Sequence, residues 1–111
     1  MQFKRNVVLR IQPEFAEGLP AIDRAWDMTT GREAYMTSAN DSQHNPGSLH
    51  PKGLAADFRI RDPGGAWALS QHELDDLISE LRLRLNGGGP VNKPFQVVLE
   101  QDHIHIEYDP R

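Results

Sequence analysis

Residues 70–86, SQHELDDLISELRLRLN, carry the clearest structural signal in this chain of 111 residues. Ser70 and Glu73 have the spacing of a capping box, in which each side chain satisfies a free backbone N–H at the start of a helix. The large apolar residues that follow recur at helical spacing and fall on one face: Leu74, Leu77, Ile78, Leu81 and Leu85. The sequence GGGP at residues 87–90 ends the helix. The segment therefore predicts one amphipathic helix that packs on a core.

Short stretches rich in apolar and β-branched residues predict strands on both sides of this helix. After Pro13, apolar residues recur near helical spacing but are interrupted by Gly18 and Pro20, which predicts two short helical turns or one broken helix. Residues 39–53 have the composition of a loop. The strands are expected at about residues 6–11, 33–37, 54–60, 95–99 and 103–108. Together these elements predict an α+β fold, a small antiparallel sheet with helices packed on one face.

The bulk composition predicts a single globular domain, residues 1–111. Hydrophobic residues make up 38% of the chain and charged residues 25%, and the apolar runs are too short to span a bilayer. No apolar segment of signal-peptide length follows the N-terminus, so we expect synthesis in the cytoplasm and action outside it only after release. A formal charge of −4 disfavours nucleic acid as a partner.

The chain contains no cysteine, which removes disulfides, thiolate metal ligands and a cysteine nucleophile together. A transition metal would therefore be held by histidine, aspartate or glutamate side chains. Four of the five histidines form two pairs, and an aspartate lies between the pairs in sequence: His44 and His50, Asp57, His103 and His105.

This pattern suits a catalytic zinc site, which takes three protein ligands and leaves one position for water. His50, Asp57 and one histidine of the second pair would supply the three ligands. A nearby carboxylate must then take the proton of the water and pass it to the leaving amine. Asp102 and Glu100 are the nearest candidates in sequence.

Residues 48–57, SLHPKGLAAD, resemble S-x-H-x-x-G-x-A-x-D, the first zinc motif of the D-Ala-D-Ala carboxypeptidase and L,D-endopeptidase family of zinc peptidases. Residues 102–105, DHIH, look like the closing motif of that family, in which an acidic residue three positions before the last histidine acts as base. The family includes D-Ala-D-Ala dipeptidases and phage endolysins, and hedgehog signalling domains share its fold. The resemblance covers residues 37–60 and 96–108.

The resemblance implies His50, Asp57 and His105 as ligands of Zn²⁺ and Asp102 as the catalytic base. In a regular strand, however, Asp102 and His105 point to opposite faces. Asp102 can reach the metal only if the chain turns or bulges near residues 101–102, and Glu100 stays open as the alternative base.

The resemblance also implies roles for smaller or more distant groups. Ser48 would lie at the edge of the cleft and hydrogen-bond to substrate or to the loop of His50. His44 and His103 match extra histidines of the hedgehog-like branch, where they are placed to stabilise the metal-bound water or the oxyanion. Gly53 and Ala55 would be small because the strand with Asp57 runs close to the metal.

One departure from the family concerns substrate binding. Many members carry an arginine after the second strand that holds a carboxylate or carbonyl of the substrate, whereas residues 37–41 here read TSAND. Arg32, Lys52 or Arg59 could replace it. Of the two tryptophans, Trp26 and Trp67, we expect packing roles, although one could line the cleft.

These features predict a zinc metallopeptidase, a hydrolase that cuts stem or cross-link peptides of peptidoglycan as a carboxypeptidase or an endopeptidase. Its partners would be peptidoglycan peptides, and we expect a monomer. The size and the missing leader point to a phage or prophage enzyme for cell wall degradation, either an endolysin or a virion component. The alternative is a non-catalytic zinc-binding interaction module of the hedgehog-like type, or a structural virion protein.

Overall fold

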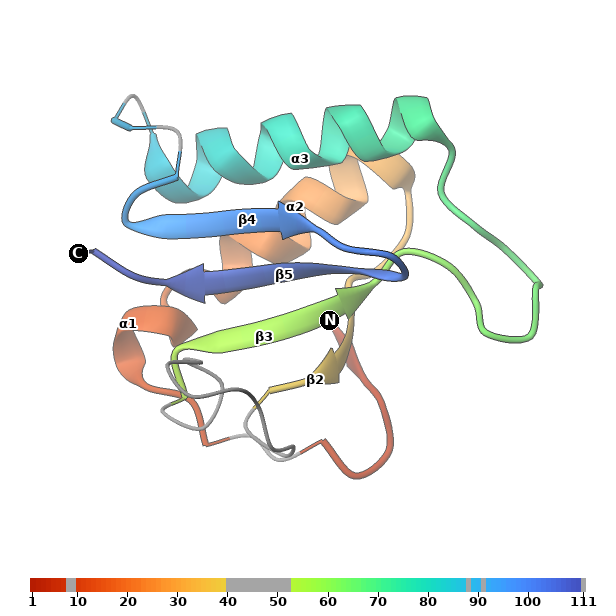
Figure 1. Ribbon diagram of the computed structural model, residues 1–111, viewed down its shortest axis with the longest axis horizontal. Coiled ribbons are helices and arrows are strands. Elements are labelled where there is room, and N and C mark those ends of the chain that lie inside the picture. Colours follow the sequence, from red (N-terminus) through yellow and green to blue (C-terminus); the bar gives the residue numbers. More distant parts are fainter. Residues whose placement is uncertain (8–9, 40–52, 88, 91, 111) are drawn as a thin grey trace.

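The computed structural model describes residues 1–7, 10–39, 53–87, 89–90 and 92–110. Five strands form one mixed sheet in the order β1-β2-β3-β5-β4, and the two longer helices cover one face of it (Figure 1). The elements along the chain are β1 (Gln2–Phe3), α1 (Pro13–Ala16), α2 (Leu19–Thr30), β2 (Tyr35–Ser38), β3 (Ala55–Arg59), α3 (Gln71–Asn86), β4 (Phe95–Leu99) and β5 (His103–Tyr108). The expected α+β class, with helices on one face, is confirmed.

Most of the predicted elements are present near their expected bounds. The helix after Pro13 is broken as expected, into α1 and α2, and β4 and β5 have the predicted ends. The capping box of α3 is formed in both directions. The Glu73 N–H donates to Ser70 Oγ (3.1 Å), and the Ser70 N–H donates to Glu73 Oε1 (3.0 Å).

Two expectations about the sheet were wrong. The first strand is β1, which lies before the predicted 6–11 segment and pairs parallel with β2, so the sheet is not purely antiparallel. The chain turns where a strand was expected to begin, because Asn6 adopts a φ of 72° and the Val7 N–H bonds to Lys4 O (3.2 Å). Residues 8–9, and residues 40–52 of the predicted loop, lie outside the described part.

Alternation along β5, and along β3 from Ala56 onward, separates a buried face from a polar face. Ala56 and Phe58 of β3 point into the core with Ile104 and Ile106 of β5, and all four are fully buried. The core reaches the helices where the ring of Trp26 lies 5.5 Å from that of Phe58. The intervening residues of both strands therefore face away from α2 and α3.

Helix α3 runs along the outer edge of β4 (Figure 1), and two of its side chains bond to that strand. Asn86 donates from Nδ2 to Phe95 O (2.8 Å) and accepts from the Phe95 N–H (2.9 Å). Arg82 donates from Nη2 to Val97 O (3.0 Å). These bonds occupy backbone groups that an edge strand otherwise offers to another chain.

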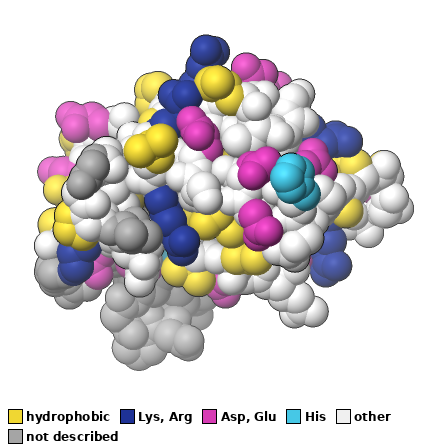
Figure 2. Space-filling model, turned by 90° about the horizontal axis from the view of Figure 1, so that it is seen from above, with side chains coloured by type: hydrophobic (Ala, Val, Ile, Leu, Met, Phe, Trp, Pro, Cys, Tyr) yellow, Lys and Arg dark blue, Asp and Glu magenta, His cyan; other side chains and the backbone are white. Residues whose placement is uncertain are grey.

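Seen from above, over α3, the surface shows charged side chains interspersed with apolar ones (Figure 2). Within the described part of the chain, none of the helices combines the length and apolar character needed to cross a bilayer.

The covered edge of β4 yields a prediction about stability. Asn86→Ala should lower the free energy of unfolding by about 1–3 kcal/mol, because it leaves the Phe95 N–H and C=O without their partner. Ser79→Ala, at an exposed position of the same helix, is the control and should change it by less than about 0.5 kcal/mol. Urea denaturation followed by circular dichroism measures both. Equal losses in the two variants would show that the bonds to Phe95 contribute nothing.

Candidate metal centre and adjoining cleft

The pairing of β3 with β5 brings together residues from the two sequence motifs. Asp57 lies directly opposite His105 in the antiparallel register. His105 Nδ1 donates to Asp57 Oδ1 at 2.9 Å, although the residues are 48 positions apart in sequence. Both lie on the polar face of the sheet, so the fold itself places two of the three predicted metal ligands side by side.

Two further side chains complete what we call the histidine–carboxylate cluster, which consists of Asp57, His103, His105 and Glu107. His103 Nε2 lies 3.6 Å from Asp57 Oδ1. His105 Nε2 donates to Glu107 Oε1 at 3.0 Å. Each imidazole nitrogen of His105 thus faces a carboxylate.

The cluster is sheltered from solvent but open on one side. The side chains of Asp57 and His105 are 14% and 16% exposed, and that of His103 is 26% exposed. Burial lowers the pKa of His105, but hydrogen bonds and charge from Asp57, and then from Glu107, outweigh it, so the pKa is raised above its usual 6.5. Without a metal, the cluster therefore favours the protonated imidazole.

The candidate bases contact different nitrogens of the His103 ring: Asp102 lies at Nδ1, whereas Glu100 lies at Nε2, the nitrogen nearer Asp57. The chain bends at residues 101–102 before β5 begins, as the base assignment required. Asp102 Oδ1 accepts from His103 Nδ1 at 2.7 Å, and Glu100 Oε1 lies 3.7 Å from His103 Nε2. The hydrogen bond from His103 lowers the pKa of Asp102, which keeps this carboxyl ionised. Both candidates contact His103.

The separations within the cluster suit a metal ion. Two ligand atoms on a tetrahedral zinc with bonds of about 2.0–2.1 Å lie about 3.3 Å apart. Asp57 Oδ1 and His105 Nδ1 are 2.9 Å apart, close to that spacing, and a proton now lies between them. The described residues alone contain no group of three such side chains arranged to hold a metal. The third predicted ligand, His50, lies outside them, as do His44 and Ser48.

Gly53 of the first motif has a reason for its small size that the sequence did not reveal. Its φ is +74°, and a Cβ at this position would lie 2.2 Å from Arg10 O. The Gln12 N–H also donates to Gly53 O at 2.8 Å. The close neighbour is thus the backbone before α1. Ala55 is fully buried on the same side of β3 as Asp57.

Glu107 was missed from the sequence, although the signal for it was present. The run His103, His105, Glu107 places every second residue on one strand face, so Glu107 must share the face of the two histidines. The motif of the resembled family ends at His105, so the resemblance does not point to Glu107.

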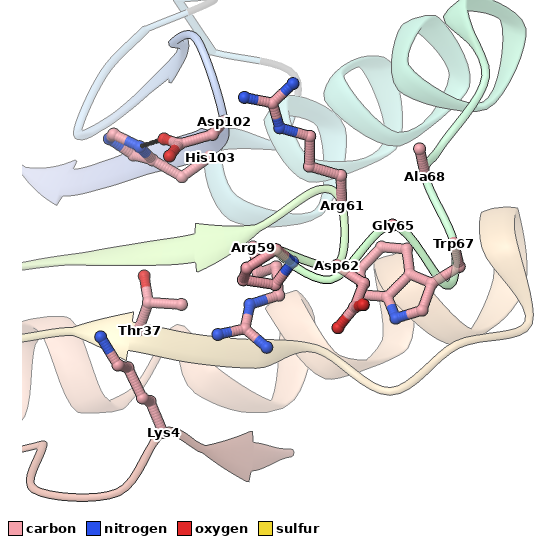
Figure 3. A pocket seen from close by; sticks show the side chains of 11 residues that line it. Lys4, Thr37, Arg59, Arg61, Asp62, Gly65, Trp67, Ala68, Asp102 and His103 are labelled. Carbon is pink, nitrogen blue, oxygen red and sulfur yellow. Dashed lines mark hydrogen bonds and ion pairs between the residues drawn. The ribbon is translucent and has the colours of Figure 1, made fainter.

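A cleft of about 730 Å³ adjoins the cluster and shares His103 with it. Figure 3 shows Asp102 and His103 at one end, Arg61 beside them, and Arg59 and Lys4 on the side of β2. Trp67 forms a wall, whereas Trp26 is in the core.

The structure places two of the three cations considered as replacements for the missing arginine. Arg59 lines the cleft, opposite His103 in the strand register. The Arg32 guanidinium stacks on the Trp67 ring, 4.5 Å from its centroid. Lys52 lies outside the described residues. Arg59 is therefore the candidate that reaches the cleft.

No family model matches this chain, and no curated protein or solved structure does either.

The two carboxylates around His105 predict a pH dependence of the metal-free protein. The pKa of His105 should exceed 6.5. It should fall in Asp57→Asn, which keeps a hydrogen-bond acceptor beside His105 but removes the negative charge. The pKa of His105 is higher in the folded protein than in the unfolded chain, where it is about 6.5. The contacts of His105 with Asp57 and Glu107 therefore stabilise the fold fully at pH values below about 6.5. This stabilisation is lost as the pH rises through the folded-state pKa. NMR titration of the His105 Cε1–H signal measures the pKa. A value at or below 6.5 contradicts the cluster geometry.

Proposed function

We propose that this protein is a zinc-dependent metallopeptidase that hydrolyses peptide bonds in peptidoglycan stem or cross-link peptides. The observation that carries the proposal is the pairing of Asp57 with His105. Two motifs that resemble one peptidase family in sequence contribute side chains 2.9 Å apart on the face of the sheet that α2 and α3 leave uncovered. The same proposal includes the assignment of this α+β fold to the hedgehog-like type.

Asp57 and His105 would bind Zn²⁺ together with His50, and Glu107 would orient His105. With Nε2–H held by Glu107, Nδ1, which faces Asp57, is the nitrogen that would be left to bind the metal. Carboxylates that hold the second nitrogen of a ligand histidine commonly raise its basicity and fix its tautomer. Glu107 is therefore a positioning residue.

When bound, zinc supplies a water whose pKa is lowered to about 7 and polarises the carbonyl of the substrate. The proton of that water needs an ionised acceptor, and the bond from His103 keeps Asp102 in that form. Asp102 would take the proton and return it to the leaving amine. His103 turns Nε2 toward Asp57, the side on which the oxyanion would develop, and His44 would assist it.

A phage or prophage origin, as an endolysin or a virion component, belongs to the same proposal. The alternative function is a zinc-binding interaction module without hydrolysis. One observation favours this alternative: the side chain of Asp102 is 62% exposed and its carboxylate is engaged by His103 Nδ1. The peptidase and the interaction module would both bind zinc, and they differ in whether Asp102 acts as a base.

The proposed zinc ligands lead to a prediction about the zinc content of the protein and its affinity for zinc. The purified protein should carry close to one zinc per chain, with a raised melting temperature, and His105→Ala and Asp57→Ala should lose it. Glu107→Gln should weaken affinity about 10–100-fold, because His105 loses its orienting partner. Competition with a chromogenic chelator measures the affinity, and Asp76→Asn on α3 controls for the charge change. Absence of metal after reconstitution with zinc would overturn the proposal.

The base assignment predicts a separation of binding from catalysis. Asp102→Asn should keep zinc and fold but lose about 10²–10⁴-fold in hydrolysis. Mass spectrometry of muropeptides after incubation measures activity and identifies the bond that is cut. Glu100→Gln is the matched variant, because Glu100 also contacts His103. If only Glu100→Gln is inactive, the base is Glu100. If the unmodified protein binds zinc and cuts nothing, the interaction module is the correct function.

A further inference from the structure

A second pocket, of about 320 Å³, lies where α1, the end of α3 and the start of β4 come together, at one end of the molecule (Figure 1). Tyr108, the last residue of β5, also lines it. Tyr108 follows the fully buried Ile106 by two residues and therefore shares its face of the sheet, the one that the helices cover. The histidines and Glu107 of β5 point to the opposite face, so this pocket is separate from the histidine–carboxylate cluster.

The inner wall of the pocket is aromatic and apolar. The rings of Phe95 and Tyr108 lie 5.4 Å apart at an interplanar angle of 70°, which is an edge-to-face arrangement. Leu85 of α3 lines the same pocket. A Cβ at Gly18 would lie 3.0 Å from both Leu85 and Phe95, so the start of α2 packs tightly against this wall. A ligand in the pocket would therefore rest its apolar part on a firm surface.

Two carboxylates stand at the rim of the pocket. Glu14 of α1 and Glu17, the residue that caps this helix, both line the pocket and are both exposed. Because they are three positions apart on one helical turn, their side chains lie on the same side of it. Within the described part of the chain, neither carboxylate takes part in an ion pair. Two negative charges thus face the same opening.

Arg84 lines the pocket as well, but its guanidinium has other partners. Arg84 Nε donates to Glu80 Oε1 at 2.7 Å, and Nη2 lies 3.0 Å from Met28 Sδ. Neither partner is among the residues that line the pocket. The charge of Arg84 is therefore balanced by Glu80, and the rim stays negative. A negative rim around an apolar wall is complementary to a cation carried on an apolar stem.

A lysine side chain has this form, with an ammonium group at the end of a four-carbon stem. The stem can lie along apolar surface while the charged end stays near water. An ammonium near an aromatic ring is also attracted by the ring itself. Its three N–H groups can reach two separate carboxylates, whereas a guanidinium forms its strongest bonds with both oxygens of one carboxylate.

We propose that this pocket is a docking site for a lysine side chain of a peptide or protein partner. The ammonium binds at Glu14 and Glu17, and the stem packs on Leu85 and on the rings of Phe95 and Tyr108. The site goes beyond the proposed function and does not rest on it. Because the pocket and the cluster lie on opposite faces of β5, both can be occupied at once.

The test is an NMR titration with three blocked peptides. They are acetyl-Gly-Lys-Gly amide, the same peptide with a neutral Nε-acetyl-lysine, and acetyl-Gly-Arg-Gly amide. The backbone N–H signals of Gly18 and Ala21 report on the pocket, and the indole N–H of Trp67, in the other cleft, is the internal control. The lysine peptide should bind at least fivefold more tightly than either of the others. Its advantage over the neutral peptide should shrink as salt screens the carboxylates.

Variants assign the effect to the pocket. Glu14→Gln and Glu17→Gln should each weaken binding of the lysine peptide, and the double variant should bind it no better than the neutral peptide. Tyr108→Leu keeps an apolar contact but removes the ring, so it should reduce the preference for the charged peptide. Asp27→Asn, at an exposed position of α2, changes the net charge equally and should have no effect. Asp57→Asn, in the cluster, should have none either.

Three results would overturn the proposal: equal binding of the neutral peptide, tighter binding of the arginine peptide, or unchanged binding in the double variant. Equal shifts at Trp67 and at Gly18 would overturn it too, because they would show non-specific attraction. The outcome is independent of the peptidase function. A protein that binds the lysine peptide here but takes up no zinc retains the docking site and loses the proposed function, and a protein that cuts muropeptides without this preference does the reverse.

Discussion

The contact on which the site depends is the hydrogen bond between Asp57 and His105 across β3 and β5. It joins a strand near the middle of the chain to the last strand, so neither motif forms a site alone. The opposite faces of the same strands bury Phe58 and Ile104 against the helices. Because one backbone register sets both faces, the packing of the core determines the geometry of the polar cluster.

Much of the fold could be predicted from the sequence because its signals are local. The capping box and apolar stripe of α3 specify the helix without long-range information, and the alternation in β5 specifies which residues face the core. The first strand could not be predicted in this way. The β-branched residues of segment 6–11 favour a strand there, whereas the strand that forms, Gln2–Phe3, contains none. The turn at Asn6 and the pairing of β1 with β2 depend on tertiary contacts.

In the site, too, the residues that local patterns identify differ from those that only tertiary contacts bring together. Asp57, His103 and His105 were identified from motifs, and the structure brings these three together. Glu107 follows from the strand period. The cleft could not be inferred, because Lys4, Arg59 and Arg61 become neighbours only when β1, β3 and the segment after β3 take their places.

One face of β5 packs in the core and the other carries the cluster, so the register of β5 against β3 determines whether the cluster forms. A slip of one residue against β3 would place Ile104 and Ile106 beside Asp57 and bury His103 and His105 among the helices. No chain with that error could present the cluster. A ligand that binds only the assembled cluster would stabilise the correct register relative to the slipped one.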